Sequence, residues 1–216
     1  MLFNPIQEVT GSVALQIKTN TAEIEITKTD EQTKEKLSGV EFELREALSG
    51  KVIGTYVTDS NGKIVITGLY QGEYVLKEIK AREEYILNIQ EENIIIQYNE
   101  TVSIEITNEL KKGSVKIIKV DNEDNTIKLA NVVFEVLDKN GNLLETIKTD
   151  ENGEAVTKEY IIRDFDKIYL REVNTREGYI LNDNITEVKL EANKVKEVFI
   201  QNQKMPKKLP NTRLLI

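Results

Sequence analysis

The amino-acid sequence repeats itself at a period of about 92 residues, which limits the chain to an architecture that is built twice. The segment TDSNG at 58–62 corresponds to TDENG at 149–153, and the segment YILN occurs at both 85–88 and 179–182. A repeat of this length is too long for one unit of a solenoid and matches one small domain. The sequence therefore predicts two similar domains in tandem.

We place these domains on either side of a short charged joint at 111–113. The predicted parts of the chain are an N-terminal segment (1–20), a first domain (21–111), a second domain (112–204) and a C-terminal tail (205–216). Val13, Leu15 and Ile17 alternate with other residues as in a strand. The N-terminal segment is therefore expected to be the remnant of an upstream module or an extra edge strand.

Each repeat consists of short β-branched runs separated by turn signals, with no long apolar period of 3.6 residues. Asn-Gly pairs at 61–62, 140–141 and 152–153 fit tight hairpin turns, because both residue types tolerate positive φ. This pattern predicts an all-β fold of two tandem antiparallel β-sandwich domains with little helix.

A charged or polar residue continues the apolar face of three predicted strands in each repeat. Lys119, for example, shares the face of Val115 and Ile117. The six residues placed in this way are Lys28, Glu78, Asn108, Lys119, Glu172 and Asn202. Because lysine and glutamate are almost never fully buried unless they are paired, one such triplet alone is better explained by an exposed face or a surface ion pair. Its duplication at closely similar spacings favours a buried cluster in both repeats.

A buried lysine, glutamate and asparagine can react by transamidation, in which a neutral lysine amine attacks the asparagine side-chain carbonyl and ammonia leaves. Burial disfavours the charged forms, so it lowers the pKa of a lysine and raises that of a glutamate. A protonated glutamate could then hydrogen-bond the amide oxygen, polarise the carbonyl and transfer protons. The predicted roles are nucleophile for Lys28 and Lys119, electrophile for Asn108 and Asn202, and catalytic acid for Glu78 and Glu172. The product would be an isopeptide bond between the first and last strands of each domain.

The composition argues against several other functions. The chain has no cysteine for disulfides and no histidine for triads or zinc sites. Its net charge of -8 argues against binding to nucleic acid or anionic membranes. No stretch approaches the roughly 18 apolar residues of a membrane helix. We expect no cofactor, no metal and no turnover enzyme, because the only convergent reactive groups would be consumed by their own cross-link.

The acidic segment Asp121, Glu123 and Asn125 is only superficially similar to a calcium loop. Thr126 stands where an EF-hand needs glycine, and Val132 stands where it needs a bidentate glutamate. We interpret this segment as a polar loop between strands.

These residues together resemble the collagen-adhesin B-type domains, also called SpaA-like or prealbumin-like domains, of Gram-positive surface proteins and pilins. The family's reactive lysine precedes an aspartate by two residues, as Lys28 and Lys119 do. Its signature Tyr-x-Leu-x-Glu-Thr-x-Ala-Pro-x-Gly-Tyr is matched by Tyr74, Leu76, Glu78, Ala81 and Tyr85, and by Leu170, Glu172, Gly178 and Tyr179. Positions that depart from it include Ile79, Arg82, Glu84, Ile168, Val173 and Arg176. The family's last-strand asparagine falls on Asn108 and Asn202. The resemblance covers about residues 21–204 and implies two immunoglobulin-like or prealbumin-like domains.

Both ends of the chain bear on where it acts. The first 20 residues lack the basic start and the unbroken apolar core of a signal peptide. The segment LPNT at 209–212 is similar to the start of a sortase sorting signal, but Arg213 stands in place of the glycine. We expect a fragment of an extracellular cell-wall protein that sortase does not anchor in this form.

The sequence and the resemblance predict a structural stalk module of a Gram-positive cell-surface adhesin, monomeric and stabilised by its own isopeptide bonds. The alternative is an adhesive module that binds a host matrix protein, a glycan or another surface-protein domain. Such a module needs an exposed apolar or aromatic patch. Tyr70, Tyr98 and Tyr160 are candidates for it, although turn-flanking or core positions explain these tyrosines equally well.

Overall fold

The structure is a computed structural model that describes residues 21–206. The strand expected at 13–17 and the sorting-like motif at 209–212 lie outside these residues. Every regular element from 21 to 206 is a strand, and no helix that could cross a membrane occurs there. The strands form two compact units, built mainly on the first and on the second repeat. The predicted all-β fold with two tandem domains is confirmed, while the boundaries at 111 and 112 stay a prediction.

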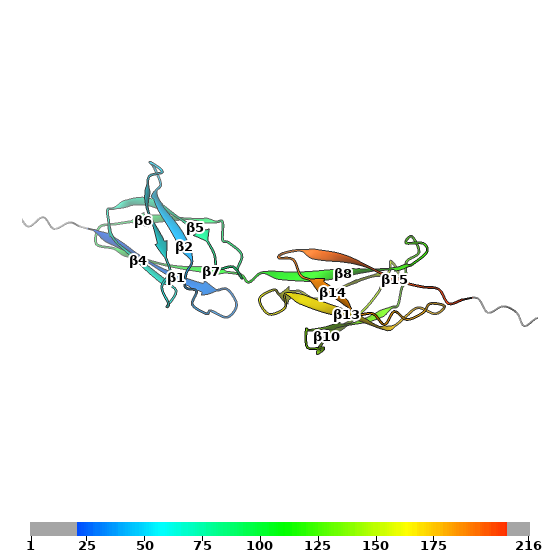
Figure 1. The fold of residues 1–216 in the computed structure, drawn as a ribbon. Coiled ribbons are helices and arrows are strands. Elements are labelled where there is room, and N and C mark those ends of the chain that lie inside the picture. The colour runs from blue at the N-terminus through cyan, green and yellow to red at the C-terminus, as the bar shows by residue number, and fades with distance from the viewer. Residues whose placement is uncertain (1–20, 207–216) are drawn as a thin grey trace, which may run out of the picture. The chain divides into compact units, whose positions relative to one another are not determined.

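The first repeat is a sandwich of two sheets (Figure 1). Its strands are β1 (Ala22–Asp30), β2 (Glu41–Glu46), β3 (Val52–Val57), β4 (Lys63–Leu69), β5 (Gly72–Lys80), β6 (Glu91–Ile96) and β7 (Thr101–Asn108). One sheet has the order β4-β1-β7 and the other the order β3-β2-β5-β6. Ile24 from the first sheet, and Phe42 and Leu76 from the second, are buried between the layers.

The second repeat has the same two-layer arrangement. Its strands are β8 (Lys112–Asp121), β9 (Val133–Leu137), β10 (Leu143–Lys148), β11 (Glu154–Val156), β12 (Tyr160–Ile161), β13 (Lys167–Asn174), β14 (Thr186–Lys189) and β15 (Val195–Asn202). In one sheet β8 pairs with β11, β12 and β15, and the other sheet has the order β10-β9-β13-β14. The core between them includes Val115, Ile117, Phe134, Leu170 and Ile200.

The first and last strands of the second repeat run parallel, which the antiparallel prediction did not include. Val198 lies opposite Ile117, and Ile200 lies opposite Lys119. A parallel pair requires a long crossover, and the strands of the facing sheet supply it here. Because the two strands point the same way, their carboxyl ends meet at one end of the sheet, where Lys119 and Asn202 lie.

The Asn-Gly turns are tight, but two of the three are not hairpins between paired strands. The turn at 140–141 does join the paired strands β9 and β10. The turns at 61–62 and 152–153 instead lead from one sheet to the other, from β3 to β4 and from β10 to β11. The prediction was wrong for these two because turn chemistry specifies a local reversal and does not specify which strands pair afterwards.

Candidate functional site

The second repeat brings its three predicted site residues together between the sheets. Lys119 lies on β8 and Asn202 at the end of the neighbouring β15, while Glu172 lies on β13 of the facing sheet. Their exposed fractions are 0% for Lys119, 4% for Glu172 and 2% for Asn202. Strand alternation explains this burial, since each residue continues the inward face of its strand. The fold therefore places three reactive side chains almost entirely out of contact with solvent.

These three side chains are in direct contact. Lys119 Nζ donates to Asn202 Oδ1 at 2.5 Å and lies 2.9 Å from Glu172 Oε2. Asn202 Nδ2 donates to Glu172 Oε1 at 2.5 Å. Because a C=O bond is about 1.2 Å long, Lys119 Nζ lies within about 3.7 Å of the amide carbon of Asn202. This separation is close to the near-attack distance of about 3 to 3.5 Å.

The glutamate contacts a different atom of the amide from the one expected. The sequence analysis placed a protonated glutamate on the amide oxygen. In the structure Glu172 accepts a hydrogen bond from the amide nitrogen of Asn202, and the amide oxygen instead accepts one from Lys119. The two carboxylate oxygens of Glu172 thus face two different nitrogens, the lysine amine and the amide nitrogen of Asn202. This geometry suits a carboxyl group that moves a proton from one nitrogen to the other.

The buried lysine lies beside an aromatic ring. Phe134 on β9 lies directly opposite Glu172 on β13, and Lys119 Nζ is 5.7 Å from the centre of the Phe134 ring. Burial lowers the pKa of Lys119 below its usual range, and the Glu172 carboxylate acts in the opposite direction. Desolvation therefore favours the neutral amine, which is the nucleophilic form.

The first repeat buries the three corresponding residues. Lys28 on β1, Glu78 on β5 and Asn108 at the end of β7 are all buried, and Lys28 Nζ lies 3.5 Å from Glu78 Oε2. Phe42 lies opposite Glu78, as Phe134 does opposite Glu172 in the second repeat. Burial lowers the pKa of Lys28 to about 8, against an opposing contribution from Glu78. Both repeats therefore hold a lysine with weakened affinity for its proton.

Backbone hydrogen bonds fix the strand at each lysine. Lys119 donates its N–H to the Gly153 carbonyl at 2.8 Å, and its own carbonyl accepts from the Leu129 N–H at 3.0 Å. Gly153 has a φ of +70°, and a Cβ added there would lie 2.6 Å from the Lys119 carbonyl oxygen. Gly62 has the same relation to Lys28, with a Cβ distance of 2.5 Å. The layer-crossing turns thus need glycine because they press against the backbone of the lysine.

The residues that neighbour the buried clusters could be predicted from the sequence only in part. Phe42 and Phe134 occupy matching positions of the two repeats, so the repeat could have identified them. Thr175 could not be found in this way, because its counterpart in the first repeat is Ala81. Its hydroxyl oxygen accepts from Asn202 Nδ2 at 2.7 Å.

The polar segment after Lys119 closes the end of the second repeat. Asp121 is fully buried, and its carboxylate accepts from the Tyr179 hydroxyl at 2.8 Å and lies 2.9 Å from Lys204 Nζ. It also accepts from the backbone N–H groups of Glu123 and Asp124 at 2.8 and 3.1 Å. The Lys204 ammonium, helped by these hydrogen bonds, holds the pKa of Asp121 far below its usual range. Asp121 therefore ties the loop after β8 to the chain that follows β15.

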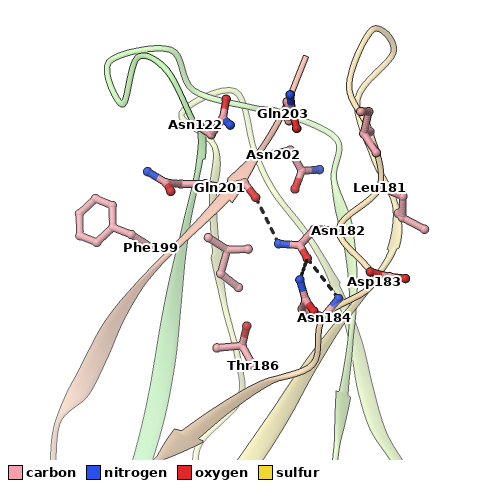
Figure 2. Close-up of a pocket in the computed structure, with 12 residues that line it drawn as sticks. Asn122, Leu181, Asn182, Asp183, Asn184, Thr186, Phe199, Gln201, Asn202 and Gln203 are labelled. Atoms are coloured by element: carbon pink, nitrogen blue, oxygen red, sulfur yellow. Dashed lines mark hydrogen bonds between the residues drawn. The ribbon is translucent and has the colours of Figure 1, made fainter. Parts of the chain in front are cut away.

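A surface groove of about 460 Å³ lies beside β15 (Figure 2). Asn182 donates its Nδ2 to the Gln201 carbonyl at 3.3 Å, and its Oδ1 accepts from the backbone and side-chain N–H groups of Asn184 at 3.1 and 3.0 Å. Phe199, which is 61% exposed, lies at the edge of this amide-rich groove. The three tyrosines considered for a ligand patch lie elsewhere. Tyr160 is in the core, whereas Tyr70 and Tyr98 are exposed.

Comparison with known proteins identifies the family of this fold. The family model of the SpaA prealbumin-like fold domain matches residues 22–110 and 113–204. No match was found among curated proteins. Among solved structures, the TIE protein of Bacillus anthracis is 28% identical with a TM-score of 0.70, over 86% of this chain and 34% of that one. The present chain thus spans about a third of that protein.

Two pilins are also similar. A streptococcal ancillary pilin is 22% identical with a TM-score of 0.43, over 88% of this chain and 64% of that one. The minor pilin GBS52 of Streptococcus agalactiae is 20% identical with a TM-score of 0.41, over 88% of this chain and 99% of that one. The expected resemblance is confirmed by the family match, which covers most of the chain. The chain belongs to the SpaA prealbumin-like fold family, with one such domain in each of its two repeats.

Proposed function

We propose that this chain is a structural module of a Gram-positive cell-surface protein in which each domain closes its own Lys-Asn isopeptide bond. The observation that carries the proposal is the contact of Lys119 with both Glu172 and Asn202 inside a closed core. Membership of the SpaA prealbumin-like family, whose resemblance pointed to Gram-positive surface proteins and pilins, supports a surface location. A monomeric stalk that holds other domains of an adhesin away from the cell wall is the role we propose for it.

The proposed reaction begins with the lysine. Glu172 Oε2, at 2.9 Å from Nζ, accepts a proton from the Lys119 ammonium and leaves a neutral amine. Surrounding apolar groups favour this transfer, because they disfavour the charged forms of both partners. The amine then attacks the amide carbon of Asn202 and forms the new N–C bond.

Departure of ammonia completes the reaction. The carboxyl group of Glu172 passes the proton it took from Lys119 to the leaving nitrogen, which lies 2.5 Å from Oε1, while the old C–N bond breaks. The attacking nitrogen returns one proton to the carboxylate. The lysine and asparagine are then joined by one amide, one ammonia has left, and Glu172 ends as the neutral carboxylic acid, holding a proton that came from the lysine ammonium. The same roles fall to Lys28, Glu78 and Asn108 in the first domain.

The mass of the intact protein tests this function directly. Two closed bonds make the folded chain lighter than its sequence by two ammonias. Peptide mapping should join Lys28 to Asn108 and Lys119 to Asn202. A purified, folded chain with the full sequence mass would reduce both clusters to buried polar networks.

The groove beside β15 supports a second candidate function, an adhesive module. An exposed aromatic ring next to several amide side chains, as at Phe199, offers one apolar contact and several hydrogen bonds to a glycan or an extended peptide. A binding screen against glycans and host matrix proteins would test it, with Phe199→Ala as the comparison. Equal binding by the wild-type protein and the Phe199→Ala variant would show that the ligand does not contact Phe199.

A further inference from the structure

The leaving nitrogen of the second domain has two hydrogen-bond acceptors. Asn202 Nδ2 donates to Glu172 Oε1 at 2.5 Å and to Thr175 Oγ1 at 2.7 Å. An amide nitrogen carries two hydrogens, so these contacts use both of them. They also fix which way the amide faces, because a reversed amide would turn its oxygen toward two oxygens and its N–H groups toward the lysine.

Thr175 is not part of the triplet that the two domains share. It follows Glu172 by three residues, a position that Ala81 occupies after Glu78 in the first domain. Alanine has no side-chain oxygen, so the first domain has no hydroxyl at this position. The second domain thus contains a polar group that the duplicated chemistry does not require.

Thr175 also lies where the buried cluster approaches the surface. It is half-buried and lines a groove of about 640 Å³ together with Lys128, Asn131, Glu151, Asn174 and Arg176. Lys119 and Phe134, in contrast, are enclosed in the core. Of the groups that contact Asn202 Nδ2, Glu172 is buried and Thr175 borders this groove.

We propose that Thr175 is a positioning residue that holds the leaving nitrogen of Asn202 on the side of the site that borders the groove. The inference rests on the isopeptide reaction proposed above. By accepting from Nδ2, the hydroxyl keeps Oδ1 toward Lys119 and keeps Nδ2 beside the proton-donating oxygen of Glu172. The side chain that contacts this nitrogen, Thr175, is the one that also lines the groove.

Closure of each domain can be timed in one chain. The full chain is recovered from inclusion bodies in denaturant, and its intact mass is checked to show that neither bond has formed. It is then refolded by dilution, and samples are quenched in acid at intervals. Peptide mapping then gives a separate time course for each domain. The first domain contains no Thr175 and therefore serves as the internal clock for every variant.

The decisive comparison is Thr175→Val, which keeps the shape, with Thr175→Ser, which keeps the hydroxyl. We expect Thr175→Val to slow closure of the second domain by roughly tenfold or more, because a misplaced reacting group costs that much or more. Thr175→Ser should restore the rate, and the first domain should close at an unchanged rate in both. Thr175→Ala repeats the test with a side chain that fits any packing.

The outcomes separate this inference from the proposed function. If both domains of the wild type lose ammonia and Thr175→Val and Thr175→Ala close as fast as the wild type, the inference fails and the isopeptide function stands. Equal slowing by Thr175→Val and Thr175→Ser would also overturn it, since packing and not the hydroxyl would then matter. If the wild-type chain refolds and retains both ammonias, the proposed function fails and this inference fails with it.

Discussion

Replacing Glu172 by glutamine should leave the second domain open. Glutamine keeps the shape and the hydrogen-bonding capacity of the side chain, but it cannot take a proton from Lys119 or give one to Asn202. The variant should therefore be heavier than the wild type by about one ammonia, with the first domain still closed. Because the bond would join residues 83 positions apart, its loss should cost about 4.5 kcal/mol of chain entropy, by the relation used for disulfides.

That loss is large for a domain of this size. It corresponds to a fall of roughly 20 °C or more in the melting temperature of the second domain. Intact-mass measurement and calorimetry of the same sample give the two quantities together. Glu187→Gln, the same change in an exposed ion pair with Lys167, is the matched control and should alter the stability by less than about 1 kcal/mol. Loss of both ammonias from the Glu172→Gln protein would refute the proton-transfer role, and an open domain with an unchanged melting temperature would refute the entropic argument.

Three further predictions follow from the structure. Each repeat expressed alone should fold as a β-rich monomer, which circular dichroism and sedimentation would measure. A fragment that folds only within the full chain would contradict the prediction of two independent domains. Gly153→Ala should destabilise the second domain more than Gly141→Ala does. Gly141 has a similar positive φ but open space around it, so its replacement should cost only the backbone strain of about 1 to 2 kcal/mol. Equal losses of stability in denaturant titrations of the two variants would contradict the close approach of Gly153 to the Lys119 carbonyl. In an Asn108→Ala protein the first domain cannot close, and Lys28 keeps its amine, whose pKa is about 8 in the folded domain and 10.5 in the unfolded chain. Between these two pH values the unfolded chain binds more protons than the folded one. The free energy of unfolding should therefore rise by about 3 kcal/mol from pH 8 to 10.5. The closed wild-type domain has no such amine, so an equal rise in both proteins would argue against the cross-link.

The burial of the six predicted site residues could be predicted from the sequence because strand alternation is a local property. A residue two positions beyond a buried isoleucine, such as Lys119 after Ile117, must lie on the same face of its strand wherever that strand packs. The duplicated spacing then favoured two buried clusters over the alternative of an exposed charged face. The turn residues were also correctly recognised as turns, for the same local reason.

Other features depended on how separate strands come together, and only the tertiary structure decided them. The parallel run of β15 beside β8 sets which end of the sheet holds Lys119 and Asn202. The path of the chain after β13 brings Thr175 to the amide nitrogen, and the packing of the two sheets turns that nitrogen toward Glu172. A hydrogen bond between side chains 27 or 30 residues apart has no signature in local sequence, because its geometry is the sum of every strand position and turn between them. The sequence by itself therefore determined which strand face each of the six predicted site residues occupies, and the packing of the two sheets decided which atoms of the Lys119, Glu172 and Asn202 side chains meet.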